Sequence, residues 1–482
     1  ILILFNIGYA FSAANFATLD GPCHLYTSSL FNSIRTDSFI QANYNFTGII
    51  TPNFLSHYIL SILFNFFSQG ESEKIFICFY FVMVPITFRY AVKLYSKQES
   101  NFSLLIFPIL YNFLLHLGFY NINLALVFFN IHLILSYHLL MNRGRWYIIL
   151  SYFINSFLLY YSHAFIFSLA IALTVIIIIV YSDFNFRSIL RKALVFLSLS
   201  IIPIIFLIYF FTTSNIINFH SDLPKTEKLQ RIVMCTPIIV SGVAEHVYVF
   251  IILGIMILLS VIILYKNYIR KDKPTTFLIF AVLIFFMMLF VEDGMFTGMM
   301  TDRLVFVFFY IIIFWISCYK ITSKWLYLLC SSVLLYSFVN LYFIKKTVVG
   351  DIGADAKKVF FASKYVKPHS YVFNVNLTEN WLEYHFGNYL ANNKPIVFIN
   401  DNHASFAWFP FTWKNPRLIE QMVESVTNYD SLNVEKLPDY VFVTGNQLKL
   451  DDQTLIKKCI RDHGEKIYSS EDNYCVLYKL NK

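Results

Sequence analysis

Two side chains that could carry chemistry, Asp20 and His24, lie four positions apart in a short polar segment after the first apolar stretch. Pro22 between them favours the first turn of a helix, where its missing N–H costs nothing. A helix that starts there places Asp20 near its N-cap and could turn both side chains toward one site. A carboxylate at this level could meet both a lipid headgroup and a water-borne partner. An ordinary helix cap and a surface ion pair are the structural alternatives.

A second group of charged residues surrounds Arg303, which opens a later apolar segment. Guanidinium is the preferred group for bidentate contact with phosphate, so Arg303 could hold a lipid-linked phosphate or pyrophosphate. Asp293 and Asp302 precede it in the same loop. Snorkelling of Arg303 to anionic lipid and pairing with Asp302 are the alternatives. Glu245, at the start of another apolar segment, is a weaker carboxylate candidate.

Aromatic residues in the polar C-terminal part are candidates for sugar binding. Trp381 and His385 share one predicted helical stretch, and residues 408–413 are mostly aromatic. Such rings can stack on sugars, although packing against the membrane part is the commoner explanation. The seven cysteines show no metal-ligand spacing, so the sequence predicts no metal site. Cys459 and Cys475 could form a disulfide if this part lies outside the cytoplasm.

Composition indicates an integral membrane protein. Hydrophobic residues make up 57% of the chain, charged residues only 14%, and the mean hydropathy is +0.60, whereas soluble domains carry roughly 25% charged residues. The sequence contains none of the common soluble-enzyme motifs and no basic stripe for nucleic acid. Apolar runs that approach spanning length lie at 1–14, 52–68, 75–95, 102–117, 121–140, 146–160, 162–181, 193–212, 246–265, 275–291, 303–320 and 324–344.

Basic residues between the later segments predict the topology. Clusters at 143–145, 187–192, 266–273 and 320–324 mark cytoplasmic loops, so the last apolar segment exits to the outside. Twelve simple crossings from an inside N-terminus would leave the tail in the cytoplasm. One short segment is therefore predicted not to cross fully, or one crossing is missed. The expected fold is a polytopic α-helical membrane protein of about 11–13 spanning helices with a C-terminal extracytoplasmic α/β domain.

The predicted domain boundary lies after the last apolar run. Residues 1–344 form the multi-pass membrane domain, and residues 345–482 form the soluble α/β domain. Alternating strand-like and helical stretches support the second assignment. The strand-like runs are Tyr371–Val375, Pro395–Ile399, Tyr440–Val443 and Tyr474–Tyr478.

With this architecture, the chain resembles the GT-C superfamily of integral-membrane glycosyltransferases, particularly a large bacterial group. The local likeness rests on the run Leu19-Asp-Gly-Pro-Cys-His-Leu25, which is similar to the D-x-P-x-H-L run of that group. Arg303 at a helix start and the segment from Trp381 to Trp413 add support.

The resemblance implies transfer of a hexose or pentose from a polyprenyl-phosphate donor to an extracytoplasmic acceptor. Asp20 corresponds to the family's first-loop acidic residue, the expected general base, and His24 joins it as a catalytic candidate. Arg303 would stabilise the departing lipid phosphate. The other substrate-binding candidates are Asp302, Glu245, Asp293, Trp381 and His385.

The expected partners are a polyprenyl-phosphate-linked sugar, membrane lipids and a glycan, lipid or protein acceptor, without nucleic acid. The expected location is the bacterial inner membrane. No definite cofactor is expected, and a divalent metal stays open, because many superfamily members pair two acids where Asp20 stands alone. A flippase or transporter and a non-catalytic envelope assembly protein are the other function classes; the former should show more buried mid-membrane charge and often inverted repeats.

Overall fold

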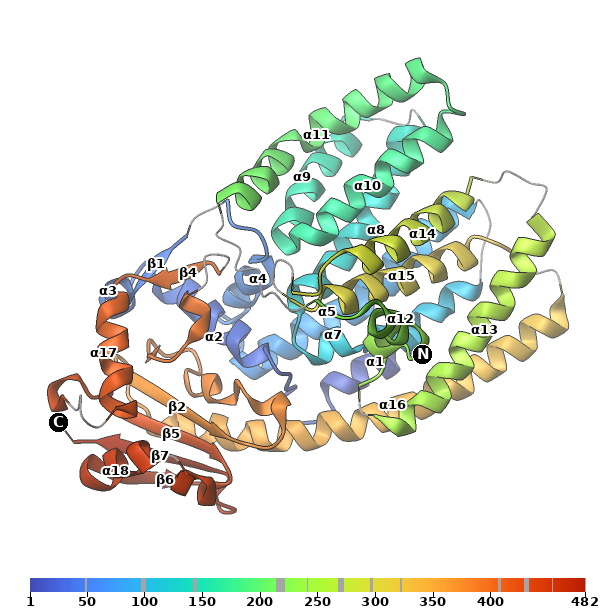
Figure 1. Ribbon diagram of the computed structural model, residues 1–482. Coiled ribbons are helices and arrows are strands. Elements are labelled where there is room, and N and C mark those ends of the chain that lie inside the picture. Colours follow the sequence, from blue (N-terminus) through green and yellow to red (C-terminus); the bar gives the residue numbers. More distant parts are fainter. Residues whose placement is uncertain are drawn as a thin grey trace. The chain divides into compact units, whose positions relative to one another are not determined.

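The computed structural model (Figure 1) describes residues 1–47, 50–96, 101–141, 145–213, 222–240, 242–267, 273–294, 298–320, 323–405, 409–428, 433–452 and 454–481. The chain divides into two compact units. The helical unit comprises Ile1–Tyr9, Cys78–His116 and Asn121–Val348. The mixed unit comprises Ala10–Ile77, Leu117–Tyr120 and Val349–Lys482, so the polar segment around Asp20 folds together with the C-terminal part.

Seven of the described helices are long and apolar enough to cross a membrane, which confirms a multi-pass α-helical membrane protein but is fewer than the predicted 11–13. Their apolar windows have mean hydropathies from 1.6 to 3.2. They are α5 (Gln69–Ser96), α8 (Tyr120–Leu140), α10 (Ala164–Tyr181), α11 (Phe186–Thr213), α13 (Val243–Asn267), α15 (Met300–Ser317) and α16 (Lys324–Ala362). Within the helical unit, α9 (Trp146–Ser162) packs against α10 and α11, and α14 (Thr275–Phe290) packs against α15.

Several apolar runs form shorter or longer helices than expected. The runs at 1–14 and 52–68 contain only α1 (Leu2–Ala10) and α4 (Leu55–Leu63), each of nine residues. The final helix, α16, instead continues to Ala362, well past the predicted end of its apolar run at 344. The apolar runs of the sequence and the observed helices therefore differ in length. The ends of a helix are set by its backbone hydrogen bonds, which need not end where the apolar residues end.

The run at 102–117 is broken into the 3-10 helix η1 (Asn101–Ile106), α6 (Phe107–Leu110) and α7 (Phe113–His116). Asn112 explains the break. Its side-chain amide donates to the carbonyls of Ile109 and Leu110, and its side-chain oxygen accepts from the amide of Leu115. These side-chain bonds replace helical backbone bonds at that point.

The mixed unit contains a five-stranded sheet in the order β3-β2-β5-β7-β6, seen in red and orange in Figure 1. Strand β2 pairs in parallel with β3 and β5, whereas β7 pairs antiparallel with β5 and β6. The sheet and its helices confirm a C-terminal sheet-containing region. The elements are β2 (Tyr371–Leu377), β3 (Val397–Phe398), β5 (Tyr440–Gly445), β6 (Gly464–Ser469), β7 (Cys475–Leu480), α17 (Pro416–Thr427) and α18 (Thr454–His463).

A second, two-stranded sheet joins the segment after Asp20 to the C-terminal part within the same unit. Strand β1 (Tyr44–Phe46) pairs antiparallel with β4 (Phe411–Trp413). Tyr44 stacks on Trp413 with ring centroids 4.7 Å apart. The described part of the predicted aromatic cluster at 408–413 therefore packs within the mixed unit; Trp408 lies outside the described residues. The remaining short helices of this unit include α2 (Gly21–Ser33) and α3 (Ser38–Asn43).

The cysteines correct one expectation. All seven are free, and Cys459 and Cys475 are buried thiols, so the predicted disulfide between them is wrong. Cys459 packs in the core face of α18 and Cys475 begins β7. Both side chains are buried, as is usual for a free cysteine, which behaves as a small apolar residue.

Candidate functional site

The helix α2 begins at Gly21 with Pro22 in its first turn, as the sequence predicts. Asp20 occupies the N-cap position, with φ −92° and ψ −6°, but its side chain makes no capping hydrogen bond. Thr18 takes that role, because its hydroxyl oxygen accepts a hydrogen bond from the amide of Gly21 at 3.0 Å. The Asp20 carboxylate, with 24% of its side chain exposed, is therefore not used to cap the helix.

The backbone of Asp20 is fixed by the segment before α8. Its amide donates to the carbonyl of Leu117 at 3.0 Å. Gly118 follows with φ +82°, a conformation that favours glycine. A Cβ atom there would lie 2.7 Å from the amide nitrogen of Gly21 and 2.9 Å from that of Asp20. Only glycine lets the two backbones approach this closely, so Gly118 positions the aspartate.

Beneath this turn lies a buried polar network that the sequence did not indicate. The hydroxyl of Tyr120 donates to Glu73 at 2.5 Å and lies 3.1 Å from the hydroxyl of Thr18. The ring of Tyr120 also stacks on His24, with centroids 5.1 Å apart. The network thus links the cap residue of α2 to a carboxylate on α5 and an imidazole on α2.

The imidazole of His24 contacts a neighbouring histidine, His57. Its Nδ1 lies 2.6 Å from Nε2 of His57 on α4, a distance at which one imidazole donates to the other. Burial, and then His57, hold the pKa of His24 well below its usual value, and burial lowers the pKa of His57 to about 3. Both rings are therefore neutral at physiological pH. Asp20 itself lies beside a different histidine, His385.

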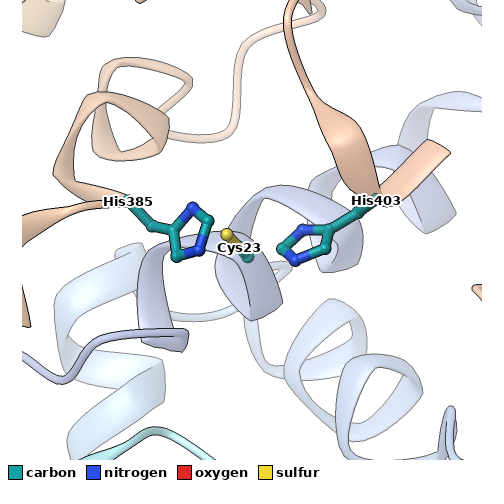
Figure 2. Close-up of side chains that lie close together, drawn as sticks. All are labelled: Cys23, His385 and His403. Carbon is teal, nitrogen blue, oxygen red and sulfur yellow. The ribbon is translucent and has the colours of Figure 1, made fainter. Parts of the chain in front are cut away.

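The other side of the first turn of α2 faces imidazoles from the C-terminal part of the mixed unit. Nε2 of His385 lies 3.6 Å from Oδ1 of Asp20. Figure 2 shows His385 and His403 on either side of Cys23, with both rings turned toward its sulfur. One ligand atom from each of these three residues lies within 4.8 Å of the others, so together they could hold a metal ion.

Burial controls the charge of these groups. It lowers the pKa of His385 to about 3 and that of His403 to about 4, so both rings are neutral and Asp20 faces an uncharged imidazole. Burial also raises the pKa of Asp401, whose Oδ1 lies 3.5 Å from Nδ1 of His403, to about 7. A cavity of about 220 Å³ adjoins the rings. Its lining is mostly polar and comprises Asn374, Asn376, Tyr384, His385, Gly387, Asn388, Asn400, Asp401 and His403.

Trp381, the remaining candidate in the mixed unit, lies in the 3-10 helix η4 (Trp381–Glu383). Just over half of its side chain is exposed, at 53%. It is therefore available to an external ring. His385 occupies the N-cap position of the next short helix, η5 (Phe386–Leu390), without a capping hydrogen bond from its side chain. The predicted continuous helix through both residues is replaced by these two 3-10 segments.

The predicted charged residues around Arg303 lie in the helical unit. Asp302 accepts a hydrogen bond from Arg231 of α12 (Lys225–Val233) and a second from Thr236 at 3.2 Å. The carboxylate of Asp293 accepts a hydrogen bond from the amide of Thr301, in the first turn of α15, at 2.9 Å. Arg303 is buried in the first turn of that helix, with 6% exposure. Both carboxylates therefore accept hydrogen bonds at the start of α15.

Glu245 has a separate structural environment in the helical unit. It is fully buried in the first turn of α13 and accepts a hydrogen bond from the amide of Val240 at 2.9 Å. Its carboxylate lies 3.8 Å from Nζ of Lys345, which donates to the carbonyls of Tyr111 and Ile238. The two buried charges compensate each other, so removal of either one would leave the other uncompensated within the helix packing.

The structure thus gathers Asp20 and His385 at one place and Asp293, Asp302 and Arg303 at another. Sequence reasoning missed Cys23, His403 and Asp401 beside Asp20. Cys23 lies close to Asp20 in sequence, but no motif marked it as a ligand. Local spacing could not have found His403 and Asp401, because both lie in the C-terminal part of the chain, far from Cys23 in sequence.

No protein-family model matches the chain, and no curated protein sequence matches it. Among solved structures, the chain is similar to ArnT from Cupriavidus metallidurans in the apo state, with a TM-score of 0.53 and 10% sequence identity. The alignment covers 99% of this chain and 96% of ArnT, so the likeness extends over the whole fold. The chain therefore shares the overall fold of ArnT, which is consistent with the resemblance noted in its sequence.

Proposed function

We propose that this protein is a membrane glycosyltransferase that moves a sugar from a polyprenyl-phosphate donor to an acceptor outside the cytoplasm. The observation that carries the proposal is the environment of Asp20, in a chain with the ArnT-like fold. Its carboxylate lies at the N-terminus of α2 and is partly exposed. It does not cap the helix, because the hydroxyl of Thr18 accepts the hydrogen bond from the amide of Gly21. Such a group is suited to accept a proton from a bound hydroxyl.

In the proposed reaction, the acceptor hydroxyl loses its proton to the Asp20 carboxylate as its oxygen forms a bond to the anomeric carbon of the donor sugar. The bond between that carbon and the phosphate oxygen breaks, and the polyprenyl phosphate leaves with the electron pair. His385, 3.6 Å from Asp20 and uncharged, is placed to orient the carboxylate or the acceptor. The reaction needs no oxidant or reductant.

Arg303 is the proposed ligand of the departing phosphate. It lies in the first turn of α15, and the neighbouring carboxylate of Asp302 is engaged by Arg231 and Thr236. A guanidinium can stabilise the negative charge that develops on the leaving phosphate. Asp293 and Glu245 then act through loop and helix packing, and Trp381 offers an exposed ring to a sugar.

Turnover by the purified protein tests this function. The full chain in liposomes is given a panel of polyprenyl-phosphate sugars labelled in the sugar, with a mixture of envelope glycans and lipids as acceptors. We expect the label to leave the polyprenyl phosphate and appear in one acceptor class. Movement of the intact donor across the bilayer without loss of its sugar would instead identify a flippase. Binding of the donor without sugar transfer and without movement across the bilayer would indicate a non-catalytic protein. Either of these two results would overturn the proposal.

A further inference from the structure

We propose that Cys23, His385 and His403 bind one divalent transition-metal ion of the zinc class. One ligand atom from each lies within 4.8 Å of the others. In Figure 2 the two imidazoles stand on opposite sides of the cysteine sulfur, each turned toward it. Asp20 is not one of the three ligands, and the metal proposal does not depend on the proposed glycosyl transfer.

The donor set selects the class of metal. A thiolate and two imidazoles are ligands that Zn²⁺ and its neighbours prefer, whereas Mg²⁺ and Ca²⁺ prefer carboxylate, carbonyl and water oxygens. Three protein ligands also leave one position of a four-coordinate zinc site for water or another oxygen ligand. Tetrahedral zinc places neighbouring ligand atoms under about 4 Å apart, so ligand atoms that lie within 4.8 Å of one another need to move by at most about 1 Å.

Side chains that surround the three ligands are placed to orient and support them. Histidines that bind metal commonly donate their second ring N–H to a carboxylate, which orients the ring. Asp20 lies 3.6 Å from Nε2 of His385, and Asp401 lies 3.5 Å from Nδ1 of His403. The amide of Asn388 donates to the sulfur of Cys23 at 3.3 Å, as expected for the support of a thiolate.

The fold also gives the site rigidity and access. Cys23 lies in the first turn of α2, and His403 lies in the short 3-10 helix η6 (Asn402–Ser405). The ring of His403 stacks on Phe409, with centroids 4.3 Å apart, which fixes its plane. The polar cavity of about 220 Å³ that includes both histidines supplies a route for an ion and for water.

Cobalt substitution tests the site directly. The full-length protein in detergent is stripped with a chelator and titrated with Co²⁺ and with Zn²⁺, without donor or acceptor. We expect one equivalent of metal and a thiolate-to-cobalt charge-transfer band. Cys23→Ser should abolish the band, and His385→Ala or His403→Ala should each weaken Zn²⁺ affinity at least tenfold. Cys459→Ser and His463→Ala, which change other residues of the same unit, should leave both the band and the affinity unchanged.

Two results would overturn the proposal. One is the absence of saturable binding or of a thiolate band in the wild-type protein, a measurement that needs no variant to fold. The other is a band that survives Cys23→Ser, which would place the metal at another cysteine. If Cys23→Ser fails to fold, loss of affinity in both histidine variants and not in His463→Ala decides the question. A failure of metal binding would leave the transfer assay untouched, so the two proposals can fail separately.

Discussion

The carboxylates of the helical unit and the carboxylate of Asp20 in the mixed unit differ in what surrounds them. Asp302 is paired with Arg231, and Glu245 lies beside Lys345. Asp20 lies instead beside His385, an imidazole that burial keeps uncharged. Removal of a partner from a buried pair leaves an uncompensated charge and is costly, whereas an acid beside neutral groups can change its protonation state.

This contrast adds to what the sequence predicts for the three acids. From the sequence, Asp20 is the expected general base, Asp302 is a substrate-binding candidate and Glu245 is a weaker carboxylate candidate. In the proposed mechanism Asp20 is the base, whereas the ion-paired carboxylates of Glu245 and Asp302 have structural roles in the helical unit.

The largest effect is expected at the buried pair of the helical unit. Glu245→Ala leaves the ammonium of Lys345 buried without its carboxylate, which should lower the free energy of unfolding by about 3–5 kcal/mol. Adding Lys345→Met should recover most of the loss, because no charge then stays buried. Chemical denaturation in detergent measures both. Glu379→Ala, which breaks an exposed pair with Lys449, is the control and should cost under about 1 kcal/mol.

The second effect concerns the fixed position of Asp20. Gly118→Ala puts a Cβ atom 2.9 Å from the amide nitrogen of Asp20 and strains a positive φ. We expect a loss of more than about 1 kcal/mol in stability and a roughly 10–100-fold loss of turnover through displacement of the aspartate. Gly242→Ala shares the positive φ but has nothing within 4 Å. Gly242→Ala should therefore lower the stability without lowering turnover. Equal losses of turnover in the two variants would contradict a positioning role for Gly118.

A smaller effect is expected at Arg303. Arg303→Lys keeps the charge but loses the two-pronged geometry for phosphate. Turnover should fall roughly tenfold, the equivalent of one charged hydrogen bond of about 1.5 kcal/mol. Arg417→Lys, an exposed position on α17, is the matched control and should behave as wild type. Unchanged donor affinity and turnover in Arg303→Lys, and also in Arg303→Ala, would leave Arg303 as a lipid-facing or packing residue.

The smallest effect on the molecule comes from probes of topology. Cys459 and Cys475 are buried, so an exposed position is needed for labelling. Leu448→Cys, at a side chain 78% exposed, should change stability by under about 0.5 kcal/mol. An impermeant maleimide added to spheroplasts should label it. Phe186→Cys, beside a predicted cytoplasmic basic cluster, should react only after lysis. The reverse pattern would invert the proposed orientation.

Some of this site could be predicted from the sequence, and the rest could not. Pro22 correctly indicated the start of α2, because the fixed φ of proline acts locally. His24 and His57, which contact each other, are 33 positions apart in the chain. A tertiary contact of this kind cannot be predicted from the spacing of neighbouring residues. The same holds for His403 beside Cys23. Strand β6, with the polar sequence of Gly464–Ser469, was missed because it lacks the alternation that marks strands.

The single substitution Asp20→Asn tests the central claim most directly. Asparagine keeps the size of the side chain but cannot accept the proton, and Thr18 supplies the helix cap in either case. With the donor and acceptor identified by the transfer assay, turnover should fall by roughly two orders of magnitude or more, with thermal stability near wild type. Asp37→Asn is the control, because Asp37 caps α3 through the amides of Phe39 and Ile40 and asparagine caps about as well, so turnover and stability should both stay near wild type. Wild-type turnover in Asp20→Asn would show that Asp20 is not the base and would contradict the proposed mechanism.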